Sequence, residues 1–294
     1  MGKKILVTGA SGYLGKQTLK SLLGKRPASE LVGLVRDVSK ATELAELGIE
    51  VRQGDYLDRA SLTPAMAGIE KVMLTSAHAF TDRNTAHGNV IDSAVEAGVE
   101  HVVFMSIIRN SSYTMKAITA DDLFAEDKLR SSGLSWTIAR HPPFLDVLGF
   151  YIGFKAHETG IKVLEGGGKM AAASRDDLAA AHAAILAGEG HAGKEYALTG
   201  DPSVSFRDIA HILSEIVGRE VPFTPLNGEE YLAHLQASTG VPEFIAEFAL
   251  EWVRGINDGE WARQTTDLEA LLGRKPQTPA EFHRDVYMPA AAAN

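Results

Sequence analysis

Short apolar runs alternate with segments of helical periodicity over the first half of the chain. The runs are rich in Val, Ile and Leu, which favour buried strands. We expect strands at residues 3–8, 31–35, 50–53, 71–75, 101–105 and 136–140. We expect helices between them at residues 17–23, 39–47, 61–67, 84–97 and 121–130. Strands that alternate with helices at this spacing predict an α/β fold with a doubly wound parallel sheet of the Rossmann type.

The pattern loosens after residue 143. The sequence predicts an alanine-rich helix at 176–187 and a strand at 195–199 that returns to the main sheet. Beyond residue 205 it predicts mainly helices, near 206–217, 228–238, 242–257 and 266–272, and a frayed tail at 290–293. We therefore expect a first domain over 1–150 and a smaller, mainly helical lobe over 151–294, of which about 174–199 returns to the first domain.

Three glycines separate the first strand from the first helix, with the spacing Gly-x-x-Gly-x-x-Gly. Gly9 permits a sharp turn, Gly12 leaves room for a pyrophosphate, and Gly15 lets the helix pack close to the strand. The helix N-terminus offers unpaired N–H groups to phosphates. Glycines also occur in ordinary strand–helix turns, but their position here favours a dinucleotide site. The residues expected to contact the dinucleotide are Gly9, Ser11, Gly12, Tyr13, Leu14 and Gly15.

Composition narrows the class of protein. The chain of 294 residues is 45% hydrophobic and 23% charged, as is ordinary for a globular protein. Its net charge of −9 argues against nucleic acid or an anionic membrane as a partner. The absence of cysteine excludes thiol catalysis, and the histidines lack metal-ligand spacing, so we expect no metal. No signal-peptide core or membrane-spanning run is evident, and we expect a cytoplasmic protein.

Ligands of such sheets bind beyond the carboxyl ends of the strands. Arg36 follows the second strand, where an acidic residue would bind the ribose of NAD, and Lys40 lies one helical turn further on. Because Arg pairs well with a 2′-phosphate, the sequence favours NADPH, with NADH as the alternative since Asp37 is adjacent. After the third strand, Asp55 and Tyr56 are expected beside the adenine, although Asp55 also suits a helix cap.

The later strands are expected to end at the nicotinamide half of the cofactor. Thr75, Ser76 and Ala77 follow the fourth strand, and their small side chains allow close approach to the nicotinamide ribose. Pro142 and Phe144 follow the sixth strand. Proline fixes the backbone there, and the phenyl ring is expected to cover the nicotinamide.

These segments resemble one family along almost the whole chain. The similar segments are 7–15, 27–29, 34–37, 51–56, 87–91, 193–196 and 271–274. The chain resembles the NmrA-like atypical short-chain dehydrogenase/reductases, and among them the branch of bacterial NADPH:quinone oxidoreductases, triphenylmethane dye reductases and azo dye reductases. The resemblance implies NADPH in the first domain and a small, flat, conjugated substrate in the cleft against the C-terminal substrate lobe.

The usual proton donor of short-chain dehydrogenases is missing. Those enzymes use a Ser and a Tyr-x-x-x-Lys motif. Ser106 occupies the expected place, but Tyr113 and Lys116 are wrongly spaced, so we expect both in a loop and Tyr113 to be dispensable. Relatives often place a His or Lys four residues before a Glu on the next helix. Glu126 matches that Glu, but Asp122 occupies the other position, where it acts either as an acid of raised pKa or as a helix-start residue.

His141 is the titratable group closest to the predicted end of the sixth strand. It is either a proton donor or hydrogen-bonded scaffold, and with Ser106 and Phe144 it is expected to shape the substrate cleft. A further aromatic and apolar set falls at helical spacing and predicts packing in the core or in a homodimer rather than a substrate wall. This set is Phe244, Phe248, Trp252 and Val253.

Three functions are compatible with these features. The first is an NAD(P)H-dependent reductase of quinone, azo or triphenylmethane compounds, in which the proton comes from solvent. The second is a non-catalytic NADP-sensing protein of the NmrA type. The third is a carbonyl or imine reductase with another acid, for which His141 is the candidate. The resemblance to the reductase branch favours the first.

Overall fold

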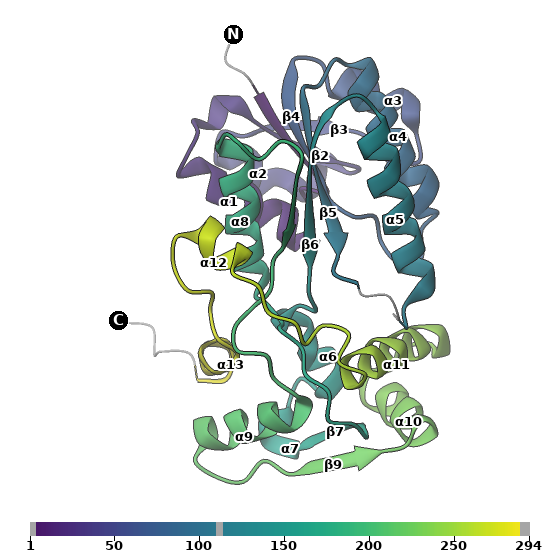
Figure 1. The fold of residues 1–294 in the computed structure, drawn as a ribbon, viewed down its shortest axis with the longest axis vertical. Coiled ribbons are helices and arrows are strands. Elements are labelled where there is room, and N and C mark those ends of the chain that lie inside the picture. The colour runs from purple at the N-terminus through teal and green to yellow at the C-terminus, as the bar shows by residue number, and fades with distance from the viewer. Residues whose placement is uncertain (1–3, 110–113, 289–294) are drawn as a thin grey trace.

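The computed structural model describes residues 4–109 and 114–288. Its large sheet has seven parallel strands in the order β3-β2-β1-β4-β5-β6-β8 (Figure 1). The strands are β1 (Lys4–Thr8), β2 (Leu31–Val35), β3 (Glu50–Gln53), β4 (Ile69–Leu74), β5 (His101–Ile107), β6 (Ser135–His141) and β8 (Lys194–Ala197). The strand order reverses between β1 and β4, where ligands of doubly wound sheets bind. The predicted fold class is confirmed.

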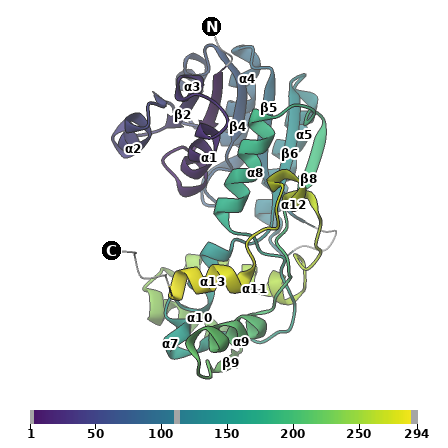
Figure 2. The same cartoon turned by 90° about the vertical axis from the view of Figure 1, so that its left-hand side faces the viewer.

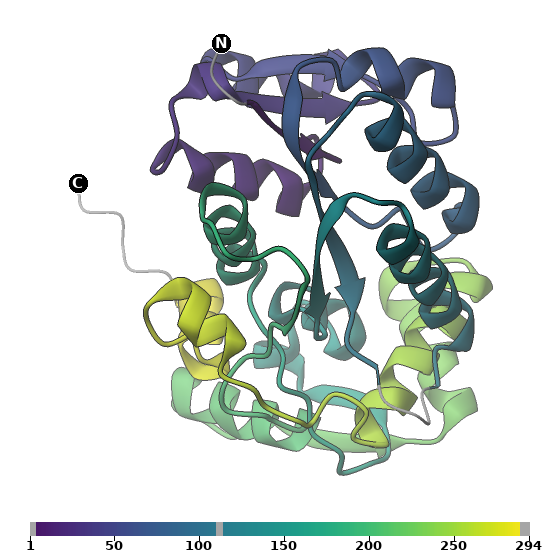
Figure 3. The same cartoon turned by 45° about the horizontal axis from the view of Figure 1, so that its top comes forward.

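Helices cover both faces of the sheet (Figures 1 and 3). One face carries α1 (Tyr13–Leu23), α2 (Thr42–Glu46) and α8 (Arg175–Ala187), and the other carries α3 (Arg59–Ala65), α4 (Arg83–Glu96) and α5 (Lys116–Ser131). Each face has its own apolar core, because alternate strand residues point to opposite sides. Figure 2 shows α8 beside α1, so both helices begin at the same edge of the sheet.

The C-terminal lobe lies beyond the carboxyl ends of the strands (Figure 1). Its two-stranded parallel sheet consists of β7 (Ile161–Leu164) and β9 (Phe223–Leu226). The surrounding helices are α6 (Leu148–Ile152), α7 (Ala156–Thr159), α9 (Phe206–Val217), α10 (Gly228–Thr239), α11 (Glu243–Asn257) and α13 (Pro279–Tyr287). Helix α12 (Asp267–Leu272) instead packs against α8 and β8. None of the helices in the described ranges is long and apolar enough to cross a membrane.

Several sequence predictions need correction. The helix expected at 39–47 is a 3-10 turn at Val38–Ala41 followed by the short α2. Lys116 does not lie in a loop but begins α5, five residues before the predicted start. The sequence missed β7, β9 and α13, because the two strands are four residues long and pair across 58 intervening residues. Tyr113 and the tail at 290–293 lie outside the described residues.

Strand β8 pairs with β6, as the predicted return to the main sheet requires. Leu198 extends this pairing, since its N–H donates to the carbonyl oxygen of Arg140 at 2.9 Å. Helix α8 precedes β8 in the chain, and its N-terminus lies beside the glycine turn. This position of α8 contributes one residue, Arg175, to the site described below.

Candidate cofactor and substrate site

A groove of about 540 Å³ lies at the carboxyl edge of the sheet. Thirteen of the fifteen residues predicted to contact a dinucleotide line it: Gly9, Ser11, Gly12, Tyr13, Leu14, Gly15, Arg36, Asp55, Tyr56, Thr75, Ser76, Ala77 and Phe144. The other two do not, because Lys40 points to solvent and Pro142 is buried. Sequence reasoning missed the remaining lining residues, which are Leu34, Val35, Gly54, Leu57, His78, Thr81, Met105 and Arg175.

The glycine turn has the geometry of a phosphate cradle. Gly9 adopts φ +62°, which only glycine takes at little cost. A Cβ on Gly15 would lie 2.6 Å from the carbonyl oxygen of Gly9, so Gly15 is required for close packing of α1. Gly12 caps α1 without a side chain, which leaves the N–H groups of the first helical turn available to an anion. The turn therefore fits a pyrophosphate.

The hydroxyl of Tyr56 stabilises the wall of the groove and is not available to bind a ligand. Its hydroxyl contacts the Thr8 hydroxyl and donates to the carbonyl oxygen of Thr75 at 2.9 Å. The Thr75 hydroxyl donates in turn to the carbonyl oxygen of Thr8 at 2.8 Å. Burial raises the pKa of Tyr56, so the phenol stays protonated. Its ring remains available to a ligand, while its hydroxyl joins β1 to β4.

The end of the groove beside β2 favours a phosphate over ribose hydroxyls. Asp37 accepts hydrogen bonds from the hydroxyl and the N–H of Ser39, at 2.6 and 3.0 Å, which lower the pKa of Asp37. Asp55 accepts from the N–H of Leu57 at 3.0 Å and closes a turn instead of capping α3. Both carboxylates are thus engaged locally. Arg36 is exposed, and its guanidinium forms no ion pair with any described residue.

Arg175 adds a second cation that the sequence did not reveal. It begins α8, and its guanidinium lies 4.3 Å from the centroid of the Tyr13 ring at the start of α1. The Tyr13 hydroxyl donates to Asp176 Oδ1 at 2.9 Å. Burial, together with the neighbouring Asp176, raises the pKa of Tyr13 to about 12. Only the packing of α8 on α1 brings this arginine to the groove, so no local motif predicts it.

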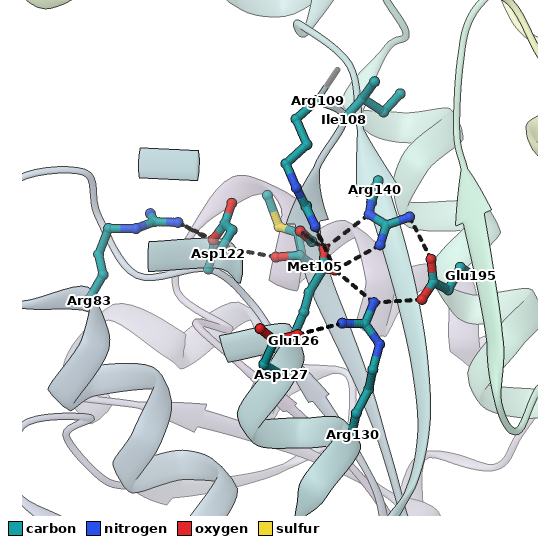
Figure 4. A network of polar contacts seen from close by, with 12 residues as sticks. Arg83, Met105, Ile108, Arg109, Asp122, Glu126, Asp127, Arg130, Arg140 and Glu195 are labelled. Carbon is teal, nitrogen blue, oxygen red and sulfur yellow. Dashed lines mark hydrogen bonds and ion pairs between the residues drawn. The ribbon is translucent and has the colours of Figure 1, made fainter. Parts of the chain in front are cut away.

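Buried polar groups hold the wall of the groove after β4, and Figure 4 shows one of them, Arg83, directed at Asp122. The Ala77 N–H donates to His87 Nε2 at 2.9 Å, and Arg83 donates to the Ala77 carbonyl oxygen at 2.5 Å. Arg83 also pairs with Asp122. Burial raises the pKa of Asp122 to about 6, although the charge of Arg83 opposes the shift. Of the two roles that the sequence left open for Asp122, the helix-start role is wrong, because Met115 is the N-cap of α5. The raised pKa agrees with the other role, although Asp122 does not line the groove.

Ser106 does not line the groove. It is buried, and its hydroxyl donates to Glu126 Oε1 at 2.6 Å. Burial alone would raise the pKa of Glu126, but its hydrogen bonds with Ser106 and arginines hold that pKa well below the usual range. The arginines that bind Glu126 are Arg109, Arg130 and Arg140. The prediction that Ser106 shapes the substrate cleft does not agree with this geometry, because Ser106 faces α5.

His141 does not line the groove either, and its ring lies behind Phe144, with 5.7 Å between the ring centroids. Its side chain is 2% exposed, and its Nε2 lies 2.7 Å from Nε2 of His182 on α8. Burial lowers the pKa of both rings, so the pair is neutral scaffold in the packing between β6 and α8. Phe144, three residues later, does line the groove.

His78 is the histidine that the groove contains. It follows β4 directly after Ala77, and its Nδ1 accepts from the N–H of Phe80 at 3.4 Å. With Nδ1 as acceptor, Nε2 carries the proton of the neutral ring. The sequence could have indicated His78 as a groove residue, because it follows a predicted strand, but no motif or spacing distinguished it from the other histidines.

The glycine turn, the groove and its two arginines, Arg36 and Arg175, define a dinucleotide-binding α/β protein. Comparison with known proteins sharpens this class. Residues 9–189 match the family described as NAD(P)H-binding, and the chain belongs to that family. The resemblance to NmrA-like atypical short-chain reductases is also confirmed.

Relatives of this chain include named reductases. It is 34% identical to quinone oxidoreductase 2 of Escherichia coli K12 over 94% of this chain and 96% of that protein. It is 26% identical to the NAD(P)H azoreductase of Xenophilus azovorans over 95% and 96%. The structure of Citrobacter sp. triphenylmethane reductase complexed with NADP(H) superposes with a TM-score of 0.88, at 31% identity, covering 96% of this chain and 99% of that chain.

Proposed function

We propose that this protein is an NADPH-dependent reductase that transfers hydride to a conjugated acceptor such as a quinone, an azo compound or a triphenylmethane dye. The groove at the carboxyl edge of the sheet carries this proposal, because it combines a phosphate cradle with an unpaired arginine. Family membership and the named reductases support the same activity. When bound, NADPH supplies the hydride from its nicotinamide ring.

Each part of the groove has a proposed role in binding the cofactor. The first turn of α1 and Arg175 bind the pyrophosphate, and Arg36 binds the 2′-phosphate. Ser76 and Ala77 approach the nicotinamide ribose, and Phe144 covers the ring. The contacts of Ala77 with α4 support this assignment, because they fix the wall against which the cofactor would be oriented.

We further propose that His78 donates the proton that some acceptors need. Reduction of a quinone to a hydroquinone takes one hydride and, overall, one proton from the protein or solvent. The imidazolium form of His78 can supply it through Nε2, the ring nitrogen that does not face the N–H of Phe80, and the ring returns to the neutral form. A triphenylmethane cation needs the hydride alone, since formation of its C–H bond already gives a neutral product.

The two alternative functions have less support. A carbonyl or imine reductase that uses His141 requires that ring in the cleft, whereas its Nε2 bonds to His182 in a buried pair. A purely sensory protein requires no acceptor site beside the nicotinamide. Among the groove residues beyond Ala77, the combination of His78, Met105 and Phe144 favours an acceptor site.

Steady-state oxidation of NADPH tests the proposal. The purified protein should oxidise NADPH with at least one of a quinone, an azo dye and a triphenylmethane dye, and should discriminate against saturated ketones. It should prefer NADPH to NADH. Tight binding of NADPH without turnover of any of these acceptors would instead support a sensor, and turnover of ketones alone would support a carbonyl reductase.

A further inference from the structure

Aromatic side chains of the two lobes meet beside the proposed acceptor end of the groove. Phe80 lies after β4 between His78 and Thr81, which both line the groove. Its ring centroid is 5.1 Å from that of Phe244 and 5.2 Å from that of Phe248, both on α11. The ring planes make angles of 83° and 63°, so the contacts are edge-to-face. We call these three residues, Phe80, Phe244 and Phe248, the aromatic bridge.

The aromatic bridge is more exposed than core packing requires. Phe80 is 48% exposed and Phe244 is 53% exposed. Val253, on another face of α11, is fully buried in the core of the lobe, and Phe248 and Trp252 pack partly against that core. The sequence predicted packing of this set in the core or in a homodimer. Val253 lies in the core, whereas Phe244 lies outside it. Large aromatic surface left open beside a groove favours an apolar ligand.

Further aromatic contacts anchor α11 in place. Phe248 lies 6.5 Å from Trp252, which stacks on Trp261 at 4.8 Å between ring centroids. The Trp261 indole N–H donates to the carbonyl oxygen of Ile108 at 2.8 Å, just after β5. The helix is therefore tied to the edge of the large sheet at one end and reaches Phe80 at the other. Figure 1 shows α11 below the N-terminal end of α5, on the same side of the molecule as α4.

A row of carboxylates runs beside the aromatic stripe of α11. Its members each precede one aromatic residue of the stripe and recur every four residues, so helical periodicity places them on the adjoining strip of surface. They are exposed, and no ion pair joins any of them to another residue within the part of the chain described. These carboxylates are Glu243, Glu247 and Glu251. The net charge of the protein is −9, which adds a long-range attraction for cations.

We propose that the aromatic bridge and the adjoining carboxylates form the acceptor subsite, and that this subsite prefers conjugated aromatic cations to anions of the same size. Aromatic faces and carboxylates both attract a delocalised cation, whereas an anion gains only the aromatic contact. The inference rests on the proposed reductase function, because it assigns the acceptor side of that site.

The proposed charge preference also has a consequence for turnover. Hydride transfer forms a C–H bond at the central carbon of a triphenylmethane cation and oxidises NADPH to NADP⁺. The electron pair of the hydride neutralises the cation, so the reduced dye loses its attraction to Glu243 and Glu247. Substrate is therefore held more tightly than product, which favours product release.

Equilibrium binding to the NADP⁺-loaded protein tests the subsite without turnover. The probes are malachite green, a triphenylmethane cation, a sulfonated anionic dye with the same core, and neutral 1,4-naphthoquinone. We expect Phe244→Ala and Phe80→Ala each to weaken malachite green binding about 3- to 10-fold. Glu247→Gln should weaken it about 2- to 5-fold and leave the quinone unaffected. The sulfonated dye should bind more weakly than malachite green in the wild type.

Matched controls separate this effect from general changes in surface. Phe124→Ala removes a 44% exposed ring from α5, and Glu220→Gln removes an exposed carboxylate between α9 and β9. Neither should change dye binding. Affinity for NADP⁺ should be unchanged in all variants, because none of the residues replaced lines the groove. Thermal unfolding shows whether each variant is folded.

Two results would overturn the subsite: equal affinity of Phe244→Ala, Phe80→Ala and wild type for malachite green, or equal affinity of wild type for the cationic and sulfonated dyes. Neither depends on the reductase function. If the wild type reduces quinones but the bridge variants bind the dye as tightly as the wild type does, the subsite is refuted and the reductase function stands. A wild type that binds the dye through the bridge but never oxidises NADPH refutes the reductase alone.

Discussion

The two ends of the groove are built by different means. The phosphate end consists of one contiguous segment, Gly9–Gly15, whose backbone forms the cradle. The proposed acceptor end draws His78, Met105 and Phe144 from three strand ends, and Phe80 beside it contacts Phe244 of the other lobe. Backbone suits a pyrophosphate, which is the same in every dinucleotide, whereas an acceptor is selected by side chains. The phosphate end is therefore local in sequence, and the acceptor end exists only in the fold.

The two buried carboxylates of α5 differ in how well their charge is stabilised. Glu126 is satisfied by Ser106 and several arginines, which keep it charged despite burial. Asp122, one helical turn earlier, has Arg83 as its close partner, and burial raises its pKa to about 6. Asp122, which lies nearer the groove wall, is thus the carboxylate of the two that gains a proton in mild acid. The contacts behind the acceptor end therefore depend more on pH than the contacts of Glu126 do.

The largest effect is expected at the phosphate end. Gly12→Val should abolish detectable NADPH binding, because the side chain occupies the space in front of the first turn of α1, while the protein stays folded. Gly15→Val should instead destabilise the fold, since its Cβ would lie 2.6 Å from the Gly9 carbonyl oxygen. Titration calorimetry and thermal unfolding distinguish the two variants. NADPH affinity of wild-type strength in Gly12→Val would contradict the backbone cradle.

The next largest effect tests the acceptor end. His78→Gln should lower kcat for a quinone by about 10²-fold, the lower range for loss of a general acid. It should leave kcat for a triphenylmethane cation within about twofold, since that acceptor needs no proton. The matched control is His211→Gln, an exposed histidine on α9, which should alter neither rate. Equal losses with both acceptors would mean that His78 only maintains the shape of the loop.

These two residues also mark how far the sequence could be interpreted. Gly12 belongs to a local pattern, and periodicity around it predicted the parallel sheet and the cofactor groove. His78 needed the fold, because its importance comes from the turn to Phe80 and from the approach of α11. Arg175 needed the packing of α8 on α1. For His141 the sequence left two roles open, proton donor or scaffold, because strand position does not reveal whether a side chain meets a groove or a buried partner. The contact with His182 agrees with the scaffold role.

A smaller effect tests the one side-chain contact proposed at the phosphate end. Arg36→Ala should weaken NADPH binding by about 1.5–3 kcal/mol, the range for a charge-assisted hydrogen bond, and leave NADH affinity unchanged. Lys40→Ala is the matched control, because Lys40 is exposed outside the groove and should change neither affinity. Calorimetric titration of both cofactors measures the difference. Equal losses for NADPH and NADH in Arg36→Ala would exclude a contact with the 2′-phosphate.

The smallest effect concerns the support behind the acceptor end. In the folded protein the pKa of Asp122 is raised from 3.8 to about 6, so the folded state takes up this proton at higher pH than the unfolded state. The folded state is therefore favoured as pH falls from about 6 towards 4, and this contribution is absent above pH 6. Asp122→Asn cannot titrate. The stability of wild type relative to Asp122→Asn should rise in acid by no more than about 1.4 kcal/mol per pH unit.

Denaturant unfolding of both proteins at pH 4, 5, 6 and 7 measures this difference. The opposite sign, with wild type losing stability relative to Asp122→Asn in acid, would mean that the ion pair with Arg83 outweighs burial and that the folded pKa lies below 3.8. At pH 7, NADPH affinity of Asp122→Asn should stay within a few-fold of wild type, because an amide oxygen can still accept from Arg83 and Arg83 still holds Ala77. A larger loss of affinity would show that the groove wall needs the charge of Asp122 and not only its hydrogen bond.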